Sequence, residues 1–345
     1  MKRLPFEDLE YIFQNTKDIW ELLRGKSIFL TGGTGFFGKW LLESFIYVNE
    51  KLDLNAKIIS LSRNPELFIQ KYSFYNAHTN SVKFVKGDIL TFDFKIDEEV
   101  QFIIHAATAA SDSLNKHNPL LMMDTITLGT RNVLDFALTQ PIESFLFVSS
   151  GAVYGKQPFD VSNIQETDSF KIDINNSNAA YSEGKRIAEL YCSTYFEKNY
   201  LPVKIARCFA FVGPYLPLDI HFAIGNFINN IINNEDIVIM GDGSTTRSYM
   251  YASDLSIAIW KILLIGNNNK PYNVGVDKAY SLKEIASILN KNYGNKVQIL
   301  NMNKDTPKNI YVPNIDTLIN ELKIKQFVQI EEAIQKTINF NTINE

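Results

Sequence analysis

Short apolar runs alternate with longer amphipathic stretches over the first two thirds of the chain. The runs are four or five residues long, a length typical of buried strands, and they are Ser27–Leu30, Lys57–Leu61, Val82–Val85, Phe102–His105, Phe145–Val148 and Val203–Ala206. Between them, apolar residues recur with helical spacing over about Gly38–Val48, Leu120–Leu138 and Ala179–Lys198. Strands that alternate with helices favour a parallel sheet covered on both faces. We therefore predict an α/β fold with a doubly wound Rossmann sheet that is complete at six strands.

The pattern changes after Gly213-Pro214, where helices and short strands no longer alternate regularly. The expected elements are helices over His221–Asn234, Ser253–Ile265 and Ser281–Tyr293, and strands over Ile237–Met240 and Tyr272–Val274. Ser281 and Glu284 have the spacing of a capping box. We expect a Rossmann domain over 26–212 and a smaller α+β domain over 213–345, interleaved with the first.

Residues 1–25 form a separate N-terminal extension. Apolar residues recur there at near-helical spacing, which predicts one or two amphipathic helices. Such an extension can pack on its own domain or on a partner subunit, and the sequence does not distinguish the two.

Composition and charge exclude several classes of function. The hydrophobic content of 46% is ordinary for a globular protein, and the net charge of −4 gives no indication of nucleic-acid binding. Cys192 and Cys208 lie in apolar surroundings and are expected in the core, and the scattered histidines predict no metal site. No leader peptide is recognisable, and no apolar run reaches the ~18 residues that a membrane span requires. We expect a soluble cytoplasmic protein with no membrane partner.

A glycine-rich turn lies between the first strand and the first long helix, in the segment KSIFLTGGTGFFGK (26–39). The glycines allow a tight turn and a close approach of the backbone to phosphates, and the helix start offers N–H groups and a positive dipole end. The spacing GxxGxxG predicts that the 26–212 domain binds a dinucleotide, with candidate contacts from Gly32, Gly35, Phe36, Phe37 and Gly38.

The end of the second strand bears on the choice of dinucleotide. Proteins that prefer NAD carry an acid there for the ribose 2′-hydroxyl, whereas this chain has Ser62 and Arg63. An arginine and a serine suit a 2′-phosphate, so we predict that NADP is preferred. In the alternative, Arg63 stacks on the adenine and NAD binds.

Three side chains are candidates for the chemistry. Tyr181 and Lys185 are four residues apart at the start of a long helix and share one helical face. A neighbouring ammonium, with the positive charge of an oxidised nicotinamide, favours the phenolate and makes the tyrosine a usable acid and base. Ser150, at the end of the fifth strand, can hydrogen-bond a sugar hydroxyl or keto oxygen beside that phenol. Ser149 is expected to be its backbone-facing neighbour.

These motifs together resemble the extended short-chain dehydrogenase/reductase family, in its nucleotide-sugar epimerase/dehydratase branch. The resemblance covers about residues 26–340 and implies further contacts. It implies adenine contacts from Asp88 and Ile89, nicotinamide contacts from Ala106, Ala107 and Thr108, and a diphosphate contact from Arg247 in a GDG…R element. It also implies that Ser150, Gly151 and Tyr181 contact the sugar of a nucleotide-diphosphate sugar, and that the long helices pair in a homodimer.

The chain departs from the family pattern at four positions. The 4,6-dehydratases of the family carry Asp and Glu directly after the strand-five hydroxyl residue, and this chain has Gly151 and Ala152. Ile126 and Ala210 replace asparagines of the NxxGT and RxxNxxGP motifs. The first departure leaves the chain poorly equipped for dehydration, and the last suggests that substrate placement differs from that in familiar members.

The function predicted from these residues is hydride transfer at sugar C4, as an epimerase or a 4-ketoreductase. A nucleotide-sugar 4,6-dehydratase is the alternative. Two remoter alternatives are a dinucleotide-sensing protein without chemistry and an enzyme that acts on a small aldehyde or ketone, which would have no diphosphate for Arg247 to bind.

Overall fold

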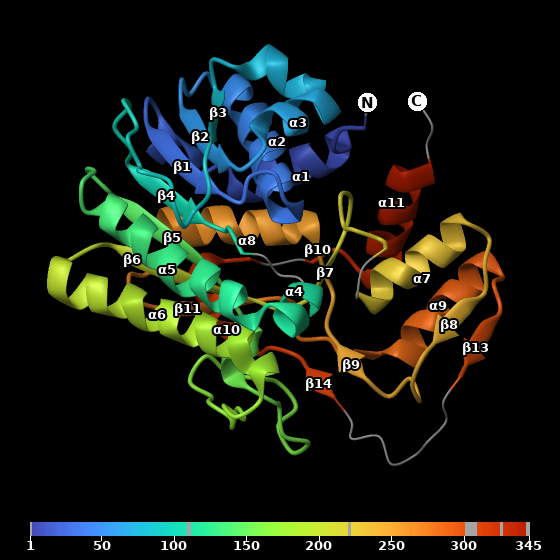
Figure 1. Cartoon of the computed structure of the whole chain (residues 1–345). Coiled ribbons are helices and arrows are strands. Elements are labelled where there is room, and N and C mark those ends of the chain that lie inside the picture. Colours follow the sequence, from blue (N-terminus) through green and yellow to red (C-terminus); the bar gives the residue numbers. More distant parts are fainter. Residues whose placement is uncertain (1, 109–111, 220–221, 301–308, 325–326, 343–345) are drawn as a thin grey trace.

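The computed structural model describes residues 2–108, 112–219, 222–300, 309–324 and 327–342. One parallel seven-stranded sheet, in the order β11-β6-β5-β4-β1-β2-β3, forms the centre of the molecule (Figure 1). Its strands are β1 (Ser27–Thr31), β2 (Lys57–Ser62), β3 (Val82–Lys86), β4 (Phe102–His105), β5 (Ser144–Ser150), β6 (Val203–Cys208) and β11 (Pro271–Val274). The predicted fold class is confirmed, and the six predicted strands are present with boundaries within two residues.

The prediction that six strands complete the sheet is wrong. β11, which the sequence placed in the smaller domain, pairs in parallel with β6 and aligns Tyr272 with Ala206. Tyr272 is fully buried at this edge. An unpaired outer edge on β6 would leave backbone N–H and C=O groups without partners, and β11 supplies them. The pairing joins segments more than sixty residues apart, which no local pattern reveals.

Helices cover both faces of the sheet. Phe29 of β1 packs into the cluster under α5 (Pro119–Ala137) and α6 (Ala180–Asn199). Its neighbours Ile28 and Leu30 pack into the opposite cluster, under α2 (Phe36–Lys51) and α8 (Ala252–Ile265). Figure 1 shows α5 and α6 side by side on one face and α8 on the other. Because both faces are buried, successive strand residues are apolar and do not alternate with polar ones.

Several shorter helices were not predicted from the sequence. They are α3 (Pro65–Lys71), α4 (Asp112–His117), α10 (Asp316–Leu322), α11 (Ile330–Thr342) and the 3₁₀ turns η2 (Ser73–His78), η3 (Gly151–Tyr154) and η4 (Ser177–Ala179). Most are under ten residues, so their apolar periodicity is too short to stand out.

The N-terminal extension packs on its own chain. It contains α1 (Phe6–Thr16) and the 3₁₀ turn η1 (Trp20–Leu23), which confirms the predicted helices. Trp20 lies against Trp260 of α8, with ring centroids 4.8 Å apart. The buried Asp8 carboxylate accepts hydrogen bonds from the Tyr251 hydroxyl (2.7 Å) and the Lys336 ammonium (2.8 Å). Of the two arrangements that the sequence allowed, these contacts show the extension packed on its own chain.

The smaller part contains three small sheets, β10-β7, β12-β9-β14 and β13-β8, and two further helices. The bounds are β7 (Phe211–Val212), α7 (Ala223–Ile232), β8 (Ile237–Ile239), β9 (Thr246–Arg247), β10 (Met250–Tyr251), β12 (Tyr280–Ser281), α9 (Leu282–Tyr293), β13 (Val297–Ile299) and β14 (Ile310–Tyr311). The capping box at Ser281 and Glu284 is confirmed. Position 221, where the sequence starts the first helix of this part, lies outside the described residues.

Candidate functional site

The glycine-rich turn connects β1 to α2 at the carboxyl edge of the sheet, as predicted. Gly32 has a φ of +79°, and a β-carbon there would lie 2.7 Å from the Ala106 carbonyl. A β-carbon on Gly38 would lie 2.3 Å from the Gly33 carbonyl oxygen. These two glycines therefore allow β1, the start of α2 and the end of β4 to meet.

Gly35 is required neither for a left-handed turn, as Gly32 is, nor for a close backbone contact, as Gly38 is. Its backbone is extended, with φ −80° and ψ −174°, and an added β-carbon would contact only the Gly32 carbonyl oxygen, at 3.3 Å. Gly35 gives α2 no side-chain cap, so the first N–H groups of the helix, at Phe36 and Phe37, have no capping side chain among the described residues. The packing of the chain does not require a glycine at position 35, and the helix start behind it is uncapped. Both features fit the binding of an anionic ligand such as a pyrophosphate.

The other predicted cofactor contacts lie along the same edge. Ser62 ends β2 and is largely buried, whereas Arg63 is exposed. Asp88 accepts the Leu90 N–H (2.9 Å) within its own turn. Ile89 packs directly on Gly129 of α5, where a β-carbon would lie 3.0 Å from it.

Lys185 is buried beneath the ends of β4 and β5. Its ammonium donates to the Thr108 hydroxyl and to the Val148 carbonyl, each at 2.8 Å, and lies 4.7 Å from the Phe147 ring centroid. Burial lowers the pKa of Lys185 to about 8. The structure thus brings together Lys185 and Thr108, which the sequence assigned separately.

His105, at the end of β4, forms a closed hydrogen-bond chain that sequence reasoning did not predict. Its two ring nitrogens lie 2.7 Å from the Thr31 hydroxyl and 3.0 Å from the Thr130 hydroxyl. Thr130 donates to the Ile126 carbonyl, so it accepts from the imidazole, and the other ring nitrogen accepts from Thr31. Burial, reinforced by the charge of Lys185, lowers the pKa of His105 to about 3. The imidazole is therefore neutral and stiffens the strand ends.

Tyr181 is the second residue of α6 and lies near Ser150. Its backbone N–H donates to the Asn115 side-chain oxygen of α4 at 3.1 Å, and its phenol lies near Ser150. Burial raises the pKa of Tyr181, and the nearby Ser150 hydroxyl opposes that rise. Lys185 was predicted to lower the pKa of Tyr181, but it is not among the causes of the Tyr181 shift in the chain without a cofactor. The Lys185 ammonium is instead directed to Thr108 and Val148.

Ser149 and Ser150 have different partners. Ser150 accepts the Ala152 N–H at 3.1 Å, while Ser149 donates to the Glu189 carboxylate at 2.5 Å. Ser149 therefore faces a carboxylate and not the backbone, contrary to the prediction. Glu189 lies four residues after Lys185, on the same side of α6, and also accepts Arg207 at 2.7 Å. This ion pair lies directly behind the strand end that carries Ser150.

Two aromatic residues that the sequence did not indicate fill the space beside Gly151. A β-carbon there would lie 2.6 Å from the Tyr311 hydroxyl and 2.7 Å from the Phe209 ring. The two rings pack on each other with centroids 4.5 Å apart. The Tyr311 hydroxyl also lies 3.4 Å from the Cys208 carbonyl oxygen, so a second phenol lies beside the residue that follows the predicted catalytic serine.

Arg247 comes from the smaller part and lies near Tyr311, with the guanidinium carbon 5.6 Å from the ring centroid. Its Nη1 donates to the Thr246 and Asn309 carbonyls and to the Asn309 side chain, at 2.9–3.1 Å. Within the described part of the chain, no carboxylate pairs with it. A half-buried guanidinium whose other edge has no partner among the described residues suits a planar or doubly charged anion.

Comparison with known proteins identifies the family. The model of the NAD dependent epimerase/dehydratase family matches residues 28–275. The chain belongs to this family. UDP-glucuronic acid decarboxylase 1 of Xenopus tropicalis is 27% identical over 320 residues, which cover 91% of this chain and 72% of that protein.

Solved structures of the same fold superpose closely. An epimerase from Methanothermobacter thermautotrophicus has a TM-score of 0.79 at 24% identity, with 96% of both chains covered. A UDP-N-acetylglucosamine 4-epimerase from Methanobrevibacter ruminantium, in complex with UDP-N-acetylmuramic acid, also has a TM-score of 0.79, at 23% identity, covering 92% of this chain and 98% of that one. At these identities the likeness establishes the fold.

The structure explains one departure from the family pattern, at Ile126, and offers no explanation for Ala210. Ile126 is buried where α5 crosses α6, and a β-carbon on Gly184 would lie 3.4 Å from it. An asparagine in that contact would need polar partners that an apolar helix interface does not supply. Ala210 is half-buried, and its carbonyl accepts the Met250 N–H at 3.0 Å.

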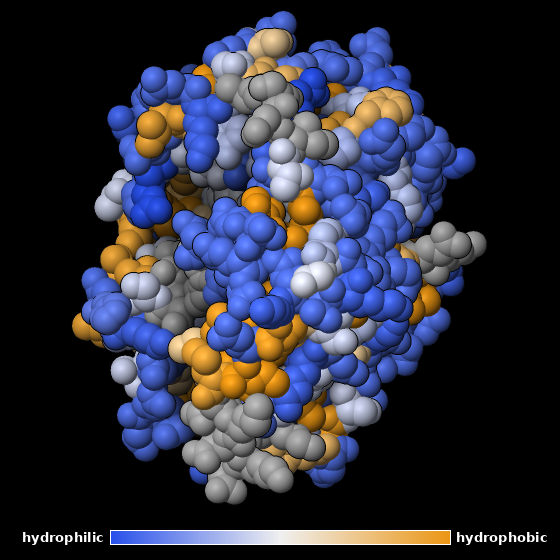
Figure 2. Space-filling view, turned by 90° about the vertical axis from the view of Figure 1, so that its right-hand side faces the viewer, coloured by the Kyte–Doolittle hydropathy of each residue, from blue (hydrophilic) through white to orange (hydrophobic). Residues whose placement is uncertain are grey.

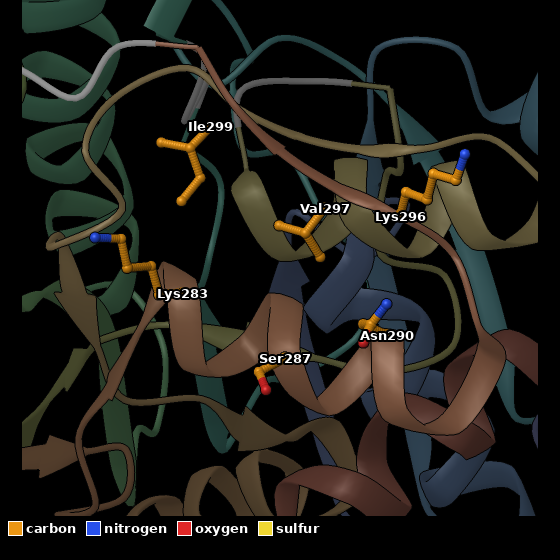
Figure 3. Close-up of a pocket in the computed structure, with 6 residues that line it drawn as sticks. All are labelled: Lys283, Ser287, Asn290, Lys296, Val297 and Ile299. Carbon is orange, nitrogen blue, oxygen red and sulfur yellow. The ribbon is translucent and has the colours of Figure 1, made fainter.

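A surface hollow and an exposed apolar patch lie in the smaller part of the chain, outside the predicted site. A hollow of about 560 Å³ is lined by α9 and β13, but Figure 3 shows that Lys283 and Lys296 point away from each other, so they form no anion site. Figure 2 shows apolar side chains gathered on the face of the smaller part. Met240 and Leu300, which follow β8 and β13, are 76% and 60% exposed. Among the described residues, no group of three potential ligands could hold a metal, and none of the helices combines the length and the apolar character that a membrane span requires.

Proposed function

We propose that this enzyme modifies a nucleotide-diphosphate sugar by hydride transfer at C4, as an epimerase or a 4-ketoreductase. The observation that carries the proposal is the proximity of the Tyr181 phenol to Ser150 at the sheet edge, one helical turn from the buried Lys185. The glycine turn, Asp88, Ile89 and the Ala106–Thr108 segment would hold the dinucleotide, and the smaller domain over 213–345 would bind the substrate.

The roles of the side chains follow from their chemistry. When bound, the dinucleotide takes up or supplies the C4 hydride. Tyr181 accepts the proton of the C4 hydroxyl as the C4–H bond breaks, or returns it when a C4 ketone is reduced. Ser150 donates to the same oxygen and holds it beside the phenol. Lys185, through its charge and its hold on Thr108, keeps the strand ends and the ribose position fixed.

Arg247 and the glycine positions decide between substrate classes. An uncommitted guanidinium edge favours a diphosphate, which a small aldehyde or ketone does not possess. The packing at Gly151 disfavours dehydration, because an acid at this position would collide with Tyr311 and Phe209. Ala152, the next residue, has no titratable group. Acid–base elimination of water at C5–C6 would therefore lack the residues that perform it in the dehydratases.

The test is to incubate the purified protein with UDP-, dTDP-, CDP- and GDP-hexoses and with their 4-keto derivatives. An epimer formed without net cofactor consumption identifies an epimerase, and stoichiometric NADPH loss identifies a reductase. A stable 4-keto-6-deoxy sugar would contradict the inference from Gly151 and Ala152. Binding of a dinucleotide without turnover of any sugar would leave the sensing protein as the better description.

A second candidate is decarboxylation of a UDP-uronic acid. It is favoured by the similarity over 91% of the chain to UDP-glucuronic acid decarboxylase. Oxidation at C4 places a ketone β to the C6 carboxylate, so carbon dioxide can leave without an added acid or base residue. UDP-glucuronic acid therefore belongs in the substrate panel, with carbon dioxide release as its readout.

We also propose that NADP is preferred over NAD, through Arg63 and Ser62. The exposed Arg63 is free to pair with a 2′-phosphate, so Arg63→Ala should weaken NADPH binding roughly 10-fold or more and leave NADH binding nearly unchanged. Fluorescence titration with both cofactors measures this, and Lys86→Ala, another exposed cation at the end of a neighbouring strand, is the control. Equal loss for both cofactors would indicate that Arg63 stacks on the adenine.

We further propose a homodimer built on α5 and α6. Leu128 and Leu190 are 47% and 65% exposed on the outer faces of these helices. Light scattering should give twice the chain mass of 39.4 kDa, and Leu190→Arg should give a single chain mass at micromolar concentration. Leu300→Arg, at a leucine exposed elsewhere, should leave the dimer intact. A monomeric wild-type protein would refute the proposal.

A further inference from the structure

The start of α6 is capped by a side chain from another helix. The N-cap residue Ala179 makes no side-chain cap, and the first N–H groups of a helix have no partner within it. The Tyr181 N–H, in this first turn, donates instead to the side-chain oxygen of Asn115 at 3.1 Å. Asn115 lies on α4, 66 residues earlier in the chain. The cap therefore depends on how α4 packs against the start of α6.

Both ends of the Asn115 amide are used. Its oxygen accepts the Tyr181 N–H, and its nitrogen donates to the Asn178 carbonyl at 2.8 Å. Because one partner is a donor and the other an acceptor, a single orientation of the amide satisfies both. Asn178 belongs to the η4 turn that leads into α6, so one side chain joins the turn before the helix to the helix itself.

The segment that follows β4 holds both predicted catalytic residues of α6. The Lys185 ammonium donates to the Thr108 hydroxyl at 2.8 Å, and the Tyr181 N–H donates to Asn115. Tyr181 and Lys185 are one helical turn apart, so two successive turns of α6 are tied to this segment. The two attachments differ in kind, because Thr108 holds the side chain of Lys185 whereas Asn115 holds the backbone of Tyr181. Lys185 therefore keeps its partner when the Asn115 amide is removed.

We propose that Asn115 is a positioning residue, whose amide fixes the start of α6 so that the Tyr181 phenol meets the C4 hydroxyl of the sugar. The inference rests on the proposed function, in which Tyr181 moves the proton of that hydroxyl. In this role Asn115 touches neither the sugar nor the dinucleotide and acts only through the Tyr181 backbone. Misplacement of a catalytic group by ~1 Å can cost about 10²-fold in rate, so loss of the cap lowers turnover although the phenol is still present.

The test is Asn115→Ala, which removes both hydrogen bonds at a half-buried position. The kcat for the nucleotide sugar that the panel identifies should fall about 10-fold, while the Kd of the preferred dinucleotide, NADPH or NADH, changes less than about twofold because Lys185 and the glycine turn are untouched. Hydrogen exchange of the Tyr181 amide should accelerate in the same variant. Asn115→Asp retains an acceptor for that amide and should recover most of the lost kcat. It is measured at alkaline pH, so that the added charge does not keep Tyr181 protonated.

A double-variant cycle shows whether Asn115 acts through Tyr181. In a Tyr181→Phe background, Asn115→Ala should lower the residual kcat less than about twofold, because the phenol that it positions is absent. Asn118→Ala is the matched control. The Asn118 side chain caps α5 by accepting the Leu121 N–H at 3.2 Å, so its removal deletes a cap of the same kind without touching α6 and should leave kcat unchanged.

These variants separate this inference from the proposed function. The positioning role alone would be overturned by an unchanged kcat in Asn115→Ala while Tyr181→Phe is inactive, by an equal fall in Asn118→Ala, or by a fall that persists undiminished in the Tyr181→Phe background. A matching loss of dinucleotide binding in Asn115→Ala would also overturn it and make Asn115 part of the cofactor site. An active Tyr181→Phe would overturn the proposed function itself.

Discussion

Replacing Tyr181 by phenylalanine should reduce turnover on the order of 10³-fold while the protein stays folded and binds its dinucleotide. The phenol is the group placed to move the C4 hydroxyl proton, and positioned acid–base catalysis contributes roughly 10²- to 10⁴-fold in enzymes. The phenylalanine ring would occupy the same space beside Ser150, so packing is preserved. Steady-state kinetics, with fluorescence titration of NADPH, separates the loss of chemistry from a loss of binding.

A matched control lies on the same helix. Tyr191 of α6 is half-buried, and Tyr191→Phe should change turnover less than about twofold because Tyr191 lies nearly three helical turns, about 15 Å, beyond Tyr181 along α6. Full activity in Tyr181→Phe would show that another group moves the proton. Loss of dinucleotide binding in the same variant would show that the phenol acts by holding the cofactor.

Removing the carboxylate of Glu189 should destabilise the protein by about 3–5 kcal/mol, the usual cost of leaving one partner of a buried ion pair behind. Arg207 and Glu189 side chains are only 15% and 11% exposed and meet at 2.7 Å. In Glu189→Leu the guanidinium retains the Tyr154 hydroxyl and the Glu166 carbonyl, neither of which is charged. Chemical denaturation of the wild type and the variant measures the difference.

The double variant distinguishes a buried charge from lost packing. Glu189→Leu with Arg207→Leu should recover much of the stability, because neither charge then stays unpaired. The exposed pair Lys26–Glu143, at 2.6 Å, is the reference, and Glu143→Leu should cost less than about 1 kcal/mol. A double variant no more stable than Glu189→Leu would show that packing, not charge, accounts for the loss. Activity should fall in Glu189→Leu even where it is folded, since Ser149 loses its acceptor next to Ser150.

Much of the candidate site could be predicted because its parts are local in sequence. The glycine turn is a run of seven residues, and Tyr181 and Lys185 are one helical turn apart. The resemblance to the family, confirmed by the match over residues 28–275, rests on these short motifs. The carboxyl ends of parallel strands share one edge, so Ser150 and Thr108 could be expected near the same site.

Other members of the site could not be predicted because their neighbours are distant in sequence. Tyr311 lies beside Gly151 because β14 pairs with β9, which aligns Tyr311 with Arg247. Phe209 meets Tyr311 only after β6 is placed beside β5. One signal was available for both residues: Gly151, directly after Ser150, has no side chain, so other residues must fill the space beside it.

The sequence alone determined the fold class, the glycine turn, the Tyr181–Lys185 pair and the lack of an acid at Gly151 and Ala152. These features depend on apolar periodicity and on the spacing of residues close together in sequence, and both can be read without knowing the tertiary structure. Contacts across long stretches of chain determined the seventh strand, the packing of α1 on α8, the ion pair behind Ser149 and the phenol of Tyr311 beside Gly151. Such contacts form only when segments distant in sequence pack against each other in the folded chain, so local sequence patterns do not predict them.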